Sequence, residues 1–327
     1  MRANRMLETV GRLIGCVRSA AQRLALGIVM GLLMTSSAIA GPYSSLYVFG
    51  DSYSDTGAGY VDGNGPTAVA YLAQNLGLSL THAGEAITSP SQSVNFAVSG
   101  ATTGFGNGVT IGDALLGYGM RNQVQDFAGL VNNGSLAFDP ATTLFFIAGG
   151  LNDSSLPTST TLANLLSEAE QLRALGAQHL AFALLPTQIP AFSAVATRLN
   201  PSYENELLPA LQANLPGADV WLSNWGGYFD DILLNPSSYG FTNVTDRCAG
   251  RALFGEDPTP CATPDTYFYY HDAHPSTAAH RVVGNALYQE VLAHEVPEPF
   301  TPALIVAGLV AMGWLRRHSK PRPPSIT

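Results

Sequence analysis

Ser52 lies where a short apolar run changes to small polar residues, in the segment YVFGDSYSDTG. A serine hydroxyl is a weak nucleophile at neutral pH, and it needs a neighbouring base such as a neutral imidazole to take its proton. Open α/β sheets bind their ligands at the carboxyl ends of the strands, where this serine would lie. The alternative is an ordinary turn, since Gly, Asp and Ser are common turn residues. Ser52 is therefore a candidate nucleophile whose partners must come from other segments.

Three other segments contain suitable partners. Gly100 follows a strand-like run in NFAVSGATTG, Asn152 follows another in LFFIAGGLND, and His274 precedes the last helix in YYHDAHPSTAAH. Because parallel strands end at one edge of a sheet, one fold can bring these residues together. The backbone N–H groups of Ser52 and Gly100 and the amide of Asn152 could then stabilise an oxyanion, with His274 as the base. A Cβ at position 100 would crowd the substrate, which explains a glycine there.

Short β-rich runs alternate with helical patterns along the chain, which predicts a parallel sheet with helices on both faces. Runs such as LFFI are apolar on both sides, as buried parallel strands should be. We expect strands at Ser45–Phe49, Val94–Val98, Thr143–Ala148, His179–Leu185 and Ala218–Ser223. We expect helices at Thr67–Leu76, Thr161–Leu175, Tyr203–Asn214 and Ser276–His294.

The four segments, in this order, resemble the SGNH hydrolases, also called GDSL lipases and esterases. Ser52, Gly100, Asn152 and His274 match the four family residues, and YGFTNVTDRCAG resembles a stretch before the family's final segment. The resemblance implies a flavodoxin-like three-layer α/β fold with a five-stranded parallel sheet. It also implies hydrolysis of carboxylic esters without a metal or cofactor.

One position departs from the family pattern. The family usually has Asp-x-x-His in the final segment, but His271 lies three residues before His274, and the nearest acid, Asp272, lies two before it. In an extended segment residues i and i+2 point the same way, so Asp272 is expected to reach Nδ1 of His274 and complete a triad. The alternative is a Ser52–His274 dyad oriented by a backbone carbonyl.

Both ends of the chain resemble targeting signals. Residues 1–40 combine five arginines, an apolar stretch and a final Ala-Ile-Ala, which predicts a signal peptide cut after Ala40. Residues 295–327 contain Pro-Glu-Pro, an uncharged run over 300–315 and an arginine pair, and resemble a bacterial PEP-CTERM sorting tail. That resemblance implies transient membrane anchoring through 300–315 and processing by an exosortase. One hydrolase domain is expected over 41–294.

The composition of the segment between the two signals limits the partners and the chemistry. Residues 41–297 contain six arginines, no lysine and 22 acidic residues, a net charge of about −16. Nucleic acids and anionic membrane surfaces are poor partners for such a chain, and chemistry that requires a lysine is excluded. Cys248 and Cys261 are the two cysteines in this segment, and export predicts a disulfide between them.

The histidines do not indicate a metal site. His271, His274 and His280 lie close in sequence but form no H-E-x-x-H motif and have no cysteine support. His280 is expected to be a packing or surface residue of the last helix, and Asp55 to cap the turn after Ser52.

The sequence thus predicts an exported bacterial serine esterase or lipase of the cell envelope or extracellular space. Lipids, acetylated polysaccharides and small esters all fit as substrates, so a polysaccharide O-acetyl esterase is one alternative. A non-catalytic surface-binding protein that keeps the fold is the other.

Overall fold

Six parallel strands form the central sheet of the computed structural model, which describes residues 42–295. The order across the sheet is β2-β3-β1-β6-β7-β8. The strands are β1 (Ser45–Gly50), β2 (Leu80–His82), β3 (Ser93–Asn95), β6 (Thr143–Ala148), β7 (His179–Ala183) and β8 (Asp219–Ser223). Every residue of β1 and β6 is buried, as their continuous apolar sequences predict.

The five predicted strands are confirmed, but the predicted number of strands is wrong. Without β2, the order is the flavodoxin-like 2-1-3-4-5 arrangement. The sixth strand, β2, extends this sheet at its edge by pairing with β3. Its sequence, LTH, is short and half-buried along its length, so it lacks the apolar run that identifies the other strands.

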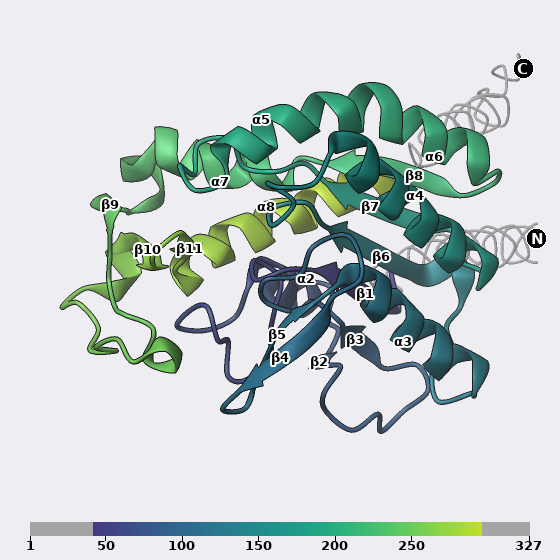
Figure 1. The fold of residues 1–327 in the computed structure, drawn as a ribbon, viewed down its shortest axis with the longest axis horizontal. Coiled ribbons are helices and arrows are strands. Elements are labelled where there is room, and N and C mark those ends of the chain that lie inside the picture. Colours follow the sequence, from purple (N-terminus) through teal and green to yellow (C-terminus); the bar gives the residue numbers. More distant parts are fainter. Residues whose placement is uncertain (1–41, 296–327) are drawn as a thin grey trace, which may run out of the picture. The chain divides into compact units, whose positions relative to one another are not determined.

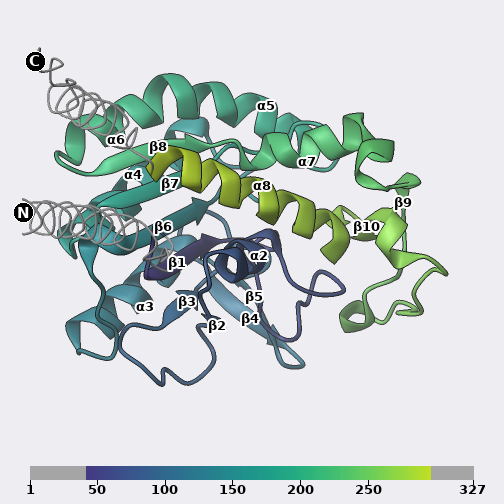
Figure 2. The same ribbon diagram turned by 180° about the vertical axis from the view of Figure 1, so that it is seen from behind.

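Helices cover both faces of the sheet. Figure 1 shows α3 and α4 on one face, and Figure 2, seen from behind, shows α2 and α8 on the other. Helix α8 packs on both α2 and α7, and α4 packs on α3 and α5. The helices are α2 (Ala68–Asn75), α3 (Met120–Asn132), α4 (Thr158–Ala174), α5 (Ser193–Ser202), α6 (Leu208–Asn214), α7 (Trp225–Leu234) and α8 (Thr277–Glu295). The described residues thus form a three-layer α/β fold.

The predicted helices are present, with one difference. The expected helix at Tyr203–Asn214 begins as a π-helical turn, Tyr203–Leu207, and continues as α6. Helix α8 begins as predicted, because Ser276 caps it by accepting a hydrogen bond from the N–H of Ala279 at 3.3 Å.

Two smaller sheets extend from the fold. One is the antiparallel pair β4 (Asn107–Ile111) and β5 (Ala114–Tyr118). The other contains β9 (Asn243–Arg247), β10 (Tyr267–His271) and β11 (His274–Pro275). The predicted disulfide between Cys248 and Cys261 is confirmed, and it closes the loop between β9 and β10.

Both predicted targeting segments fall outside the described residues: residues 1–40 entirely, and the sorting tail with its apolar run over 300–315. Within residues 42–295, no helix has the length and apolar character needed to span a bilayer.

Candidate active site

Ser52 lies in the turn that follows β1, at the carboxyl edge of the central sheet. The N–H groups of Ser54 and Asp55 each donate to the carbonyl of Asp51 at 3.0 Å, which closes the turn around the serine. Ser52 is only 6% exposed. The residue predicted as the nucleophile is therefore held by a rigid turn.

His274 lies next to Ser52, although it comes from the carboxyl-terminal part of the described chain. Its Nε2 lies 2.9 Å from Ser52 Oγ, within hydrogen-bond distance. The strand that carries His274, β11, pairs with β10, and the hydroxyl of Tyr53 donates to the carbonyl of Ala273. The pKa of His274 is lowered mainly by burial, which keeps the imidazole neutral and able to accept a proton.

Gly100 and Asn152 lie on two neighbouring loops at the same edge. The N–H of Val98 donates to the carbonyl of Gly50 at 3.1 Å, which places the loop containing Gly100 beside the end of β1. Asn152 Nδ2 donates to the carbonyl of Ala101 at 2.9 Å. Within the described part of the chain, the N–H groups of Ser52 and Gly100 donate to no other protein atom. These donors remain available for an oxyanion.

The backbone conformation of Gly100 accounts for a glycine at this position. Its φ is +76°, a region that L side chains rarely adopt. An added Cβ would meet only the backbone of Gly117, with the nearest atom at 3.5 Å. The position therefore favours glycine for its conformation, and the crowding of a substrate by a Cβ stays a prediction.

Two buried aspartates connect these loops by hydrogen bonds, and the sequence predicts a role for only one of them. Asp55 accepts hydrogen bonds from the N–H groups of Gly57 and Ser99, both at 2.7 Å, so it caps the turn after Ser52 as predicted and also fixes the loop before Gly100. Asp153 was not predicted. Its carboxylate accepts from the N–H of Thr103 at 3.0 Å and from the hydroxyls of Thr103 and Thr161 at 2.5 and 2.8 Å. Asp153 thus ties the loop of Asn152 to the loop of Gly100.

The predicted contact between Asp272 and His274 is wrong. Asp272 and Ala273 form the tight turn between β10 and β11, with Asp272 at φ +20°, so the segment is not extended and the i, i+2 relation does not hold. The Asp272 side chain is 55% exposed and bonds to Arg247 at 2.6 Å. Nδ1 of His274 is buried and has no hydrogen-bond partner among the described residues. The backbone-carbonyl alternative is therefore not seen either.

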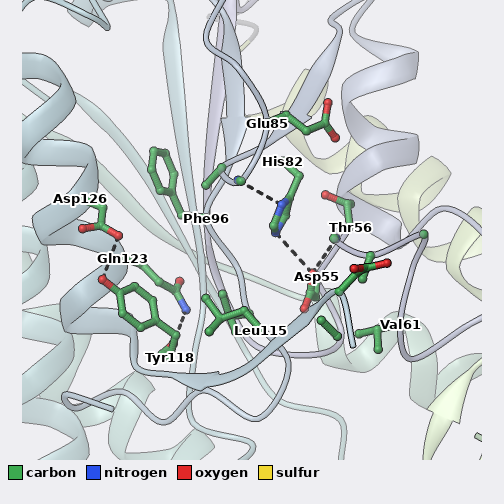
Figure 3. A pocket seen from close by; sticks show the side chains of 18 residues that line it. Asp55, Thr56, Val61, His82, Glu85, Phe96, Leu115, Tyr118, Gln123 and Asp126 are labelled. Atoms are coloured by element: carbon green, nitrogen blue, oxygen red, sulfur yellow. Dashed lines mark hydrogen bonds and ion pairs between the residues drawn. The ribbon is translucent and has the colours of Figure 1, made fainter. Parts of the chain in front are cut away.

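A pocket of about 440 Å³ lies beside the serine turn, and Asp55 contributes to its wall. Figure 3 shows His82 and Asp55 pointing toward each other, Gln123 and Tyr118 on another side, and Phe96 above them. His82 Nε2 lies 3.8 Å from Asp55 Oδ1. Glu85, Asp113 and Asp126 add carboxylates to a lining that also contains apolar side chains such as Phe96 and Leu115, so the pocket is acidic but partly apolar.

No cluster of metal-ligating side chains occurs within residues 42–295. His280, one of the three histidines considered above, is buried, and its Nδ1 accepts the N–H of Ala68 at 3.2 Å. It packs in the core, as predicted.

Comparisons with known proteins indicate the family of the chain. A sequence profile described as GDSL-like Lipase/Acylhydrolase matches residues 46–287. The chain therefore belongs to this family.

Curated relatives match over shorter segments. A GDSL esterase/lipase of Arabidopsis thaliana is 31% identical over 99 residues, which are 27% of this chain and 27% of the relative. A second one from the same plant is 27% identical over 110 residues, covering 32% and 31% of the two chains. The chain thus spans about a third or less of the length of these relatives. Among solved structures, a member of the lipolytic G-D-S-L family from Veillonella parvula is 13% identical with a TM-score of 0.40, covering 75% of this chain and 96% of that one.

Proposed function

We propose that this protein is a serine esterase that hydrolyses carboxylic esters through an acyl intermediate on Ser52. The observation that carries the proposal is the 2.9 Å contact between Ser52 Oγ and His274 Nε2 at the carboxyl edge of the sheet. Membership of the GDSL-like lipase/acylhydrolase family supports it. A non-catalytic binding protein would have no need of this contact, so the geometry favours the enzyme.

The mechanism follows from the positions of the groups. Ser52 Oγ bonds to the ester carbonyl carbon as its proton moves to His274 Nε2, and the electron pair of the C=O bond moves to the oxygen. The N–H groups of Ser52 and Gly100 and the amide of Asn152 stabilise that oxyanion. Collapse of the intermediate expels the alcohol, which takes the proton from Nε2. A water molecule then repeats the sequence and releases the acid and free Ser52.

The pocket beside the serine turn bears on the alcohol part of the substrate. Its lining includes the carboxyl groups of Asp55, Glu85, Asp113 and Asp126 as well as apolar side chains such as Phe96 and Leu115. We therefore propose that the alcohol part of the ester is uncharged or cationic, since an anionic group would be repelled by these carboxylates. An acetylated polysaccharide with neutral sugars fits this condition, and so does a small neutral ester.

Reactivity of Ser52 is the direct test. An organofluorophosphonate should label Ser52 alone, and Ser52→Ala should lose more than about a thousandfold in turnover of p-nitrophenyl acetate. Turnover across a series from acetate to octanoate esters gives the acyl length that the site accepts. Ser44→Ala is a matched control, because that serine is exposed and bonds only to Thr142. Label on another serine, or full activity of Ser52→Ala, would refute the mechanism.

We also propose that the protein is exported and that an exosortase-type protease removes its tail. The support is the pattern of residues 1–40 and 295–327, together with the Cys248–Cys261 disulfide, a bond typical of oxidising compartments. In a host that contains an exosortase, the intact mass should correspond to a chain that begins at Gly41 and ends near Pro297. A mature species that retains Arg316 and Arg317 would contradict the sorting-tail assignment.

A further inference from the structure

A second carboxylate lies next to the Ser52–His274 pair. Asp62 belongs to the loop between β1 and α2, and its side chain is only 4% exposed. Its Oδ1 lies 3.9 Å from His274 Nε2, and its Oδ2 accepts a hydrogen bond from the hydroxyl of Ser99. Asp62 therefore faces the same ring nitrogen that receives the proton of Ser52.

Arg251 partners this carboxylate. Its Nη2 lies 2.5 Å from Asp62 Oδ1, and its side chain is 16% exposed. Arg251 comes from the loop closed by the Cys248–Cys261 disulfide, and its guanidinium lies 4.2 Å from the ring centre of Phe254. Among the described residues, the other arginine–carboxylate pairs are those of Arg247, whose side chain is 44% exposed. The Asp62–Arg251 pair is thus a largely buried ion pair beside His274.

We propose that Asp62, in place of the outward-facing Asp272, is the positioning carboxylate of His274. The positive charge of Arg251 then limits how strongly Asp62 stabilises the protonated imidazole. This inference rests on the proposed esterase function. When His274 accepts the proton of Ser52, Nε2 becomes an N–H in a positively charged ring. A fixed carboxylate at 3.9 Å stabilises that imidazolium, whereas the nearby guanidinium opposes it. Asp62 acts on Nε2 rather than Nδ1, so the arrangement differs from a linear triad.

The charges around His274 predict effects of opposite sign. Burial lowers its pKa most, Asp62 raises it, and Arg251 lowers it. Other charged or titratable neighbours are His271, which lowers the pKa, Asp272, which raises it, and the neutral, buried His280 in α8. Tyr53 packs on the His274 ring, and Asp55 and Tyr60 line the same small cavity. Removal of the Asp62 charge should therefore lower the pKa of His274, and removal of the Arg251 charge should raise it.

The pH dependence of Ser52 acylation by an organofluorophosphonate, measured on the mature chain, tests this. In Asp62→Asn, the midpoint of the acid limb should move down by about one pH unit, and the plateau rate should fall at least about tenfold. In Arg251→Gln the midpoint should move up. Arg251→Lys keeps the charge and should leave the midpoint close to that of the unmodified protein. Asp272→Asn removes an exposed carboxylate and should change it far less than Asp62→Asn does.

Equal midpoints in Asp62→Asn, Arg251→Gln and the unmodified protein would overturn the proposal, and so would shifts of the same sign. If Asp62→Asn does not fold, the upward shift in Arg251→Gln and its absence in Arg251→Lys decide the question. The NMR titration of the His274 imidazole, assigned from His274→Gln, reports the same shifts without turnover. Failure of the esterase function itself would instead appear as an unlabelled Ser52 in the unmodified protein.

Discussion

Replacement of Asp153 by alanine should weaken both the fold and the site, because this carboxylate joins the two loops that carry the proposed oxyanion donors Gly100 and Asn152. The carboxylate is fully buried and accepts three hydrogen bonds from Thr103 and Thr161. Bonds to a charged group contribute about 1.5–3 kcal/mol each, and the donors left without a partner would be poorly solvated. Since the bonds share one acceptor group and are not additive, we expect a loss of about 3–5 kcal/mol in the free energy of unfolding.

Turnover should fall as well, because the loop of Asn152 would lose its bonds to Thr103 and keep only the bond from Asn152 Nδ2 to Ala101 as its described side-chain link to the loop of Gly100. Urea unfolding, followed by circular dichroism, gives the loss of stability, and p-nitrophenyl acetate gives the loss of turnover in the folded variant. Asp139→Ala is the matched control: Asp139 caps an exposed turn through a bond from the N–H of Ala141 at 3.0 Å, and it lies away from the site. A loss below about 1 kcal/mol in Asp153→Ala, no larger than in the control, would refute the reasoning.

Two further outcomes follow from other contacts. The Cys248–Cys261 disulfide spans 13 residues, so the double serine variant should lose about 3 kcal/mol of stability in the chain-entropy model; urea unfolding measures the loss, and an unchanged midpoint would contradict it. Burial raises the pKa of Asp51 to about 8 and that of Asp55 to about 7, so the folded state holds protons that the unfolded state releases near pH 4. Their contribution therefore decreases the stability as the pH rises from about 4 to 8, by up to about 1.4 kcal/mol per pH unit for each group. Asp51→Asn should make the dependence of the urea midpoint on pH shallower between pH 5 and 7; an equally steep dependence would show that Asp51 is ionised in the folded protein.

The sequence predicts structure best where the deciding residues are neighbours along the chain. Continuous apolar runs identified β1 and β6, because strands buried on both faces need them. Ser52, Gly100 and Asn152 could be found because each follows such a strand. Their catalytic roles, like that of His274, remain predictions.

Features that depend on contacts between distant segments cannot be predicted from the sequence pattern. Asp62 and Arg251 lie in irregular loops far apart in the chain, and no pattern in either loop indicates that the two meet at His274. Asp153 looked like an ordinary turn residue. The predicted contact of Asp272 with His274 requires an extended backbone, whereas the chain reverses direction at Asp272.

The separation of Ser52 and His274 along the chain has a consequence for how the protein is made. The two residues are 222 positions apart, and His274 lies on β11, just before the final helix of the described domain. At a synthesis rate of about 5–20 residues per second, a growing chain carries Ser52 for about 10–45 seconds before His274 is added. Helix α8, which packs on α2, arrives later still. Under the proposed mechanism, the growing chain therefore contains its nucleophile throughout most of synthesis but lacks the base that would activate it, and hydrolytic activity would begin only when the domain is nearly complete.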